Sequence, residues 1–170
     1  MAQPAARATA RRSPTVDELA VWRDYVETSE AVRRTLAAGL QSSSGISPGD
    51  YSVMLALSEA PDRELRSSAL ADLCGWERSR LSHHLRRMEE RDLVARRQAG
   101  DDARSAIVAL TDVGARIFRS SSAAHLRLVR EVFVDALTPE QLEAVRTTTA
   151  ALHRHLDARA AAAAPETSTD

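Results

Sequence analysis

The chain has a single cysteine, Cys74, among its 170 residues. An intramolecular disulfide is therefore impossible, which is typical of proteins that work in a reducing cytosol. No apolar run approaches the length of a membrane span. The first residues, 1–14, include three arginines but lack the apolar stretch of a secretory signal, so we expect a cytoplasmic protein.

Lysine is absent, so all 23 basic side chains are arginines, and aromatic residues make up only 4% of the sequence. Hydrophobic residues reach 44%, carried mostly by alanine and leucine, which favours helices over β-sandwiches. The formal net charge is −1, whereas nucleic-acid-binding proteins are often strongly basic. This net charge argues mildly against nucleic-acid binding. The charge is unevenly distributed, however, because the arginines are concentrated in the middle of the chain and residues 165–170 are acidic.

Motifs of enzymes and metal sites are also missing. The chain has no glycine-rich phosphate loop, no nucleophile elbow and no convincing pair of catalytic carboxylates, so we expect no enzymatic activity and no cofactor. The histidine pairs His83–His84 and His153/His155 do not form a converging set of ligands, so we expect no metal. Cys74 is interpreted as a buried small hydrophobe rather than a redox sensor.

The segment from Ser67 to Gly114 has the most informative pattern in the chain. It predicts a short helix over Ser67–Cys74 that is capped by Ser67 or Ser68 and stopped by Gly75. A second helix, a strand, a polar turn and a second strand follow: Arg78–Arg91, Leu93–Gln98, Ala99–Asp102 and Arg104–Leu110. A helix-turn-helix followed by a basic hairpin is typical of proteins that bind duplex DNA.

The second of these helices has two unlike sides. If Leu81 lies at the centre of the buried side, the helical repeat places His84, Leu85 and Met88 beside it. The other side has no acid and carries groups that can contact base edges or phosphates: Ser79, Arg80, Ser82, His83, Arg86 and Arg87. The alternative interpretation is a solvated face whose arginines serve solubility.

Helices are also predicted on both sides of this segment. Apolar spacing indicates a long helix over Val16–Leu40, followed by a polar break at 41–45, and a short strand at Leu65. Ser47 and Thr138 each open a helix with proline next and an acid or amide three residues on. Residues 111–136 predict a further helix, whose serines at 120–122 suggest a bend or a surface face. In the first helix of the Ser67–Gly114 segment, Leu70 and Leu73 are the expected core residues.

The flanking helices carry apolar stripes that are too long for the central unit to cover. We therefore predict a two-fold symmetric homodimer, with a monomeric helical bundle as the alternative. The expected fold is mainly α with a small β-hairpin wing. Its parts are a flexible arm at 1–14, dimerisation helices at 15–46 and 115–157, a winged helix-turn-helix DNA-binding domain at 47–114, and a flexible tail at 158–170.

Three motifs within residues 65–114 resemble those of MarR-type regulators. The run from Asp102 to Gly114 is similar to the family's wing, with D-x-R, a strand ending in Leu-Thr and a helix with an early glycine. Ser79–Ser82 matches the family's helix-turn-helix, and Arg87–Val94 matches its exit into the wing. The adjacent histidines at 83 and 84, and Glu77 at the helix cap, depart from the usual pattern.

The resemblance implies an obligate dimer that places two recognition helices in successive major grooves of a pseudo-palindromic operator. Arg104 would be the wing arginine that reaches a minor groove, and Asp102 would brace the wing. A regulator of this kind, most simply a repressor, is our first hypothesis for the function. The alternative is a winged-helix protein-interaction module that does not bind DNA specifically.

A small-molecule effector is a further expectation. The groove between the dimer helices and the DNA-binding lobe would be apolar and concave. Trp22, Tyr25 and Tyr51 are candidates to line it, although they serve equally well as core residues.

Overall fold

The computed structural model describes residues 13–99 and 102–163, with side chains described for 13–98 and 106–163. The chain divides into two compact units, residues 1–125 and 126–170, which we treat separately. Unit 1 contains most of the secondary structure, in this order: α1 Val16–Ser44, α2 Pro48–Glu59, η1 Pro61–Arg63, β1 Glu64–Arg66, α3 Ser67–Cys74, α4 Arg78–Glu89, β2 Val94–Ala99, β3 Asp102–Leu110 and the start of α5 Asp112–Val129.

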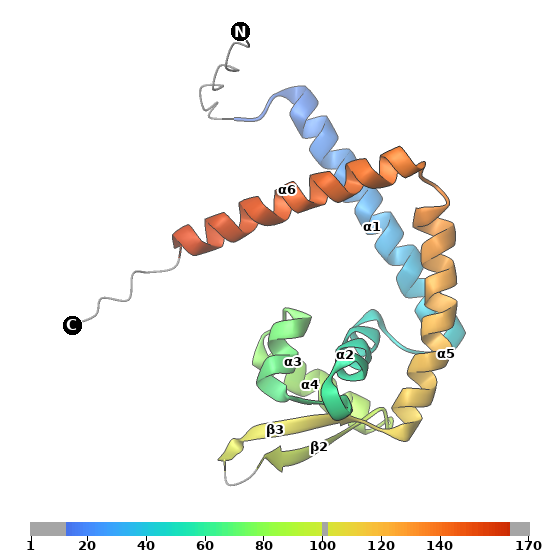
Figure 1. Cartoon of the computed structure of the whole chain (residues 1–170), viewed down its shortest axis with the longest axis vertical. Helices are drawn as coiled ribbons and strands as arrows, with labels where there is room; N and C mark the ends of the chain where they lie inside the picture. The colour runs from blue at the N-terminus through green and yellow to red at the C-terminus, as the bar shows by residue number, and fades with distance from the viewer. Residues whose placement is uncertain (1–12, 100–101, 164–170) are drawn as a thin grey trace, which may run out of the picture. The chain divides into compact units, whose positions relative to one another are not determined.

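The predicted winged helix-turn-helix is confirmed in unit 1 (Figure 1). Its three-stranded antiparallel sheet has the order β1-β3-β2. The central strand pairs Val108 with Leu65 on one side and with Arg96 on the other, so the short strand expected at Leu65 exists. Helices α2 and α3 pack on β3, and α4 packs on β2.

Local capping residues set several helix ends. The predicted capping box of α2 is present, because Ser47 and Asp50 each bond the other's backbone N–H. Gly45 and Gly75 adopt left-handed φ angles of 64° and 63° and end α1 and α3. The predicted break at 41–45 is wrong except at Gly45, because α1 continues helical through the serines.

The core of unit 1 lies between α2, α3, α4 and the sheet. Leu70, Leu81, Leu85 and Met88 are fully buried, as predicted. Leu73 was expected there but is 67% exposed, because α3 buries the face formed by Leu70 and Ala71. The cap of α3 also differs from the prediction, since Arg66 occupies it without a side-chain hydrogen bond.

The serines of α5 do not break the helix. The hydroxyls of Ser120 and Ser121 both donate to the carbonyl of Ile117, at 2.9 and 2.8 Å, so they are satisfied inside the helix. Ser121 is fully buried, whereas Ser120 is exposed. The irregular turn comes later instead, as the π-helix η2 over Arg130–Val134.

Unit 2 contains the helix α6, Pro139–Ala163. The predicted capping box is confirmed by reciprocal hydrogen bonds between Thr138 and Gln141. The helix runs past residue 158, so the expected start of a flexible tail lies inside a helix. Residues 1–12 and 164–170, which include most of the expected arm, lie outside the described residues.

Candidate nucleic-acid interface

Helix α4 presents a polar surface that we call the basic face, made of Ser79, Arg80, Ser82, His83, Arg86 and Arg87. All of these residues are exposed, while Leu81, His84, Leu85 and Met88 are buried on the other side. The core contacts therefore fix which side of α4 points outward. Both sides of the helix are as the sequence predicts.

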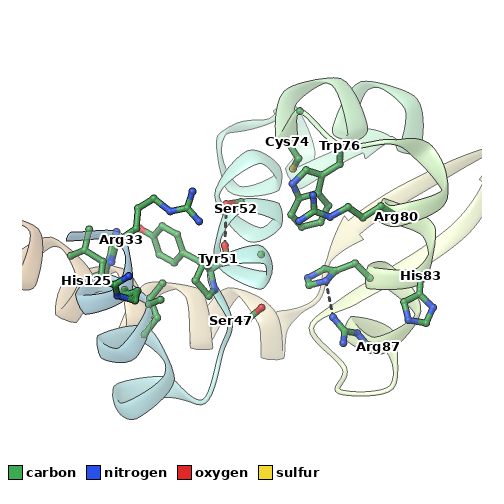
Figure 2. Close-up of a pocket in the computed structure, with 18 of the residues that line it drawn as sticks. Arg33, Ser47, Tyr51, Ser52, Cys74, Trp76, Arg80, His83, Arg87 and His125 are labelled. Atoms are coloured by element: carbon green, nitrogen blue, oxygen red, sulfur yellow. Dashed lines mark hydrogen bonds between the residues drawn. The ribbon is translucent and has the colours of Figure 1, made fainter. Parts of the chain in front are cut away.

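The arginines of the basic face contact aromatic or imidazole groups. The Cζ atom of Arg80 lies 4.7 Å from the ring centroid of Trp76 (Figure 2). Arg86 Nη2 lies 3.3 Å from His83 Nδ1, and Arg87 Nη2 lies 3.0 Å from His84 Nδ1. None of these guanidinium groups forms an ion pair with a carboxylate among the residues that the structure describes.

Two acids, one at the end of α4 and one on β1, form ion pairs with arginines of the wing. Glu89 pairs with Arg96 of β2, and Glu64 of β1 pairs with Arg97. These pairs attach the base of the wing to α4 and to β1. Among the described residues, the arginines of the basic face form no such pair, so positive charge gathers on this face despite the net charge of −1 for the whole chain.

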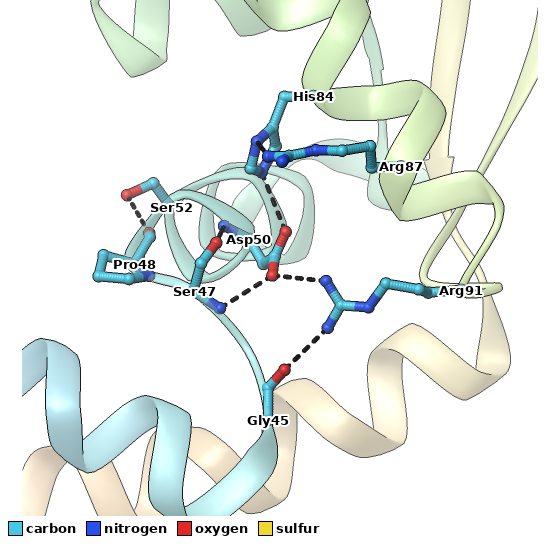
Figure 3. Close-up of polar contacts among 8 residues, drawn as sticks. All are labelled: Gly45, Ser47, Pro48, Asp50, Ser52, His84, Arg87 and Arg91. Atoms are coloured by element: carbon cyan, nitrogen blue, oxygen red, sulfur yellow. Dashed lines mark hydrogen bonds and ion pairs between the residues drawn. The ribbon is translucent and has the colours of Figure 1, made fainter.

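A buried carboxylate ties α4 to the start of α2 (Figure 3). Asp50, whose side chain is 4% exposed, accepts hydrogen bonds from the Ser47 amide at 2.9 Å and from Arg91 Nη1 at 2.8 Å. Arg91 also donates to the carbonyl of Gly45 at 3.0 Å. Burial alone would raise the pKa of Asp50, but these hydrogen bonds and the Arg91 charge lower it on balance.

His84 completes this network. Its Nε2 lies 3.0 Å from Asp50 Oδ1, and Arg87 contacts its Nδ1. Because a guanidinium only donates, Nδ1 must accept, and the proton of the neutral ring is then on Nε2, facing Asp50. Burial lowers the pKa of His84, and the charges of Arg87 and Arg91 act in the same direction against the effect of Asp50.

The wing is described only in part. Its strands pair antiparallel as far as Ala99 and Asp102, with an irregular register after Gln98. The side chains of Asp102 and Arg104 lie outside the described residues, so their predicted roles stay predictions. Sequence analysis missed the bracing arginines Arg96 and Arg97. Glu64, the partner of Arg97, lies 33 positions away in the chain, and Glu89, the partner of Arg96, lies on a different element seven positions away.

A cavity of about 970 Å³ lies beside the basic face, within unit 1. Its walls include Arg33 and Leu36 of α1, Tyr51 of α2, and Arg80 and His84 of α4. The ring of Tyr51 contacts His125, at 4.6 Å between centroids (Figure 2).

The other two aromatic candidates for an effector site lie elsewhere on α1. Trp22 and Tyr25 are exposed, with ring centroids 6.2 Å apart, and neither lines this cavity. Trp76 does line it and was missed. Trp76 precedes Arg80 by four residues and His84 by eight, and this helical spacing could have indicated that the three side chains lie on one side.

The described residues offer no metal site and no reactive cysteine. Among the described residues, no cluster of histidine, cysteine or carboxylate side chains could hold a metal ion. Cys74 packs partly buried against the core, and burial raises the pKa of its thiol. No helix in the described ranges is both long and apolar enough to cross a membrane.

Comparisons with known proteins agree with this geometry. A sequence model described as "MarR family" matches residues 44–105. No curated protein matches the sequence. Among solved structures, AbsC, a MarR family transcriptional regulator from Streptomyces coelicolor, is 32% identical with a TM-score of 0.79, over 87% of this chain and 99% of that one.

A second MarR family regulator from S. coelicolor, solved in complex with DNA, is 33% identical with a TM-score of 0.79, over 85% of this chain and 94% of the other. A mutant of MarR from E. coli complexed with operator DNA shares the fold, at 19% identity and a TM-score of 0.70, over 82% of this chain and 99% of that one. Because two regulators above 30% identity are matched over nearly their whole length, and because the winged helix-turn-helix is present, this chain belongs to the MarR family of transcriptional regulators.

Proposed function

We propose that the protein is a homodimer that binds double-stranded DNA at pseudo-palindromic operators and acts as a repressor. The observation that carries the proposal is the basic face of α4, where Arg80, Arg86 and Arg87 are exposed without a carboxylate partner among the described residues. The relative from S. coelicolor that was solved with DNA supports it.

The basic face suits a major groove. Arginine can bind guanine through two parallel hydrogen bonds, and serine and histidine can contact base edges or phosphates. Phosphate neutralisation supplies affinity, whereas contacts to base edges supply sequence preference. Arg104 at the wing would enter the flanking minor groove, where a narrow groove enhances negative potential.

Exposed apolar residues on the terminal helices support the dimer. Val16, Leu19, Trp22 and Val26 of α1 repeat at intervals of three to four residues and are each more than 40% exposed. On α6, Val145, Leu152 and Leu156 follow the same helical spacing and are also exposed. Such apolar stripes are stable in water when a second copy of the chain covers them. In the resulting dimer, the helix α4 of each copy would contact one half-site of the operator, with the half-sites roughly one helical turn of DNA apart.

The cavity beside α4 supports an effector-responsive regulator. Its volume is large enough for a small organic molecule, and Arg80, His84 and Arg87 of α4 are part of its wall. A regulator of chromosomal DNA acts where the chromosome lies, so the proposal includes a cytoplasmic location.

A gel-shift titration over operator variants, selected first from a random duplex pool, tests the function. Arg104→Ala is expected to weaken binding with little change in sequence preference, whereas Arg80→Ala and His83→Ala are expected to change the preference itself. Arg119→Ala on the exposed surface of α5 is the matched control. Unchanged binding in all three variants of the interface would contradict the proposal.

The salt dependence of binding to random duplex separates the two hypotheses. DNA binding through phosphates must release counterions, so affinity falls as salt rises. A flat dependence would favour a winged-helix protein-interaction module instead.

A further inference from the structure

We propose that Trp76 and His84 are positioning residues that hold the guanidinium groups of Arg80 and Arg87 in the orientations needed to read DNA. The inference rests on the proposed DNA binding and names side chains that need not touch DNA themselves. Neither residue lies on the exposed basic face: Trp76 precedes α4, and His84 is buried beneath it.

Each arginine is held by a ring that is itself packed against the core. Trp76 packs against the core cluster and offers its ring to Arg80, with 4.7 Å between Cζ and the ring centroid. His84 accepts a hydrogen bond from Arg87 at 3.0 Å while its other nitrogen faces the buried Asp50. Arg86 differs, because its contact is the exposed His83.

The two rings form one unit. Trp76 and His84 meet edge to face, with centroids 5.1 Å apart and an interplanar angle of 78°. Gly49 at the start of α2 leaves the room they need, because a Cβ built there would lie 3.0 Å from atoms of both rings. The indole of Trp76, from the segment before α4, and the imidazole of His84, from α4, therefore support the two arginines together. Figure 2 shows Trp76 against Arg80, and Figure 3 shows His84 between Arg87 and Asp50.

Positioning of this kind changes binding because arginine is a long and flexible side chain. An unrestrained arginine loses rotamer freedom when it binds, and that loss opposes binding. A guanidinium whose plane is already set loses less and favours one bidentate geometry. Arg80 and Arg87 should therefore contribute more to sequence preference than Arg86 does.

A double-mutant cycle on DNA affinity tests the His84–Arg87 pair. His84→Asn keeps an acceptor close to the Nδ1 position and should bind a selected operator within about twofold of wild type. His84→Gln lacks that acceptor and should lose roughly tenfold in specific affinity. In an Arg87→Ala background, His84→Gln should cause no further loss, because the group it positions is gone.

The Trp76–Arg80 pair is tested in the same way. Trp76→Phe keeps an aromatic face and should stay close to wild type, whereas Trp76→Leu should lose roughly fivefold, but not in an Arg80→Ala background. Gly49→Ala disturbs both rings from α2 and should lower specific affinity more than affinity for random duplex. Additive losses in both cycles, or a neutral His84→Gln, would overturn the proposal.

Tryptophan fluorescence tests the contact between Trp76 and Arg80 with Trp76 and His84 left in place, so it does not depend on whether variants of those two residues fold. In a Trp22→Phe protein, the emission comes from Trp76, since the chain has two tryptophans. Arg80→Ala should shift that emission, whereas Arg86→Ala should not; equal spectra would count against the contact. If wild type binds no selected duplex better than random duplex, the proposed function fails; specific binding with additive cycles contradicts only the positioning role.

Discussion

Gly114 of α5 lies so close to the carbonyl oxygen of Leu93 that a Cβ built on it would be 2.0 Å from that oxygen. The same corner is held by Thr111, whose hydroxyl donates to the Asp92 carbonyl at 2.6 Å and accepts from the Gly114 amide at 2.9 Å. The contact joins the exit from α4 to the return from the wing. It explains the glycine in a motif that sequence analysis used only as a family resemblance.

Gly114→Ala should therefore destabilise the fold strongly. Backbone must move to admit the methyl group, and overpacking typically costs about 1–3 kcal/mol, occasionally more. Urea denaturation followed by circular dichroism measures the change. Gly45→Ala is the control, because its φ is 64° but nothing lies within 4 Å of the added Cβ, so only backbone strain of about 1 kcal/mol is expected. Equal losses in the two variants would refute the steric argument.

Stability should fall as the pH drops from 7 to 5. Burial lowers the pKa of both His84 and His125 below the ordinary value of about 6.5, so the unfolded chain takes up protons first. The contribution of the two neutral histidines to the free energy of unfolding is complete above the unfolded-state pKa. It is lost as the pH falls from there toward the folded-state pKa, by at most about 1.4 kcal/mol per pH unit for each group.

Substitution separates the contributions of the histidines to this slope. His84→Gln and His125→Gln should each flatten the dependence of the unfolding free energy on pH. His153→Gln on the exposed surface of α6 is the control and should leave it as in wild type. A slope that none of the variants alters would show that these two rings do not cause it.

Leu152→Glu on α6 should weaken the proposed dimer. The side chain is 44% exposed and belongs to the apolar stripe with Val145 and Leu156, and a carboxylate would have to be buried there on association. Sedimentation velocity should then report a monomer at concentrations where wild type is dimeric. Arg154→Glu, about half a turn away around the helix, should remain dimeric; dissociation of both variants alike would point to a general charge effect.

Cys74 should react slowly with a thiol-reactive dye. Burial raises the pKa of its thiol, so little thiolate is present near neutral pH, and the side chain is only partly accessible. The rate with a chromogenic disulfide reagent at pH 8 should be at least about tenfold lower for the folded protein than in urea. A folded rate equal to that in urea would contradict the structural role.

Much of the fold follows from local sequence. Ser47 with Asp50, Thr138 with Gln141, and Gly75 act over at most three or four residues, so the corresponding helix ends are predictable from the chain. The two sides of α4 follow from helical periodicity alone. The error at Leu73 arose because periodicity in a short helix does not decide which neighbouring face the core will take.

The supports of the basic face could be known only from the tertiary structure. Asp50 was predicted only as the acid of the capping box that Ser47 opens, but its bond with Arg91 joins residues 41 positions apart. The links from Arg96 to Glu89 and from Arg97 to Glu64 likewise depend on how the wing packs.

The sequence by itself therefore determined the helices, the wing, the family and which side of α4 is basic, because these depend on spacing along the chain. Only the tertiary structure decided which rings hold Arg80 and Arg87, since such contacts form when separate elements pack around one core.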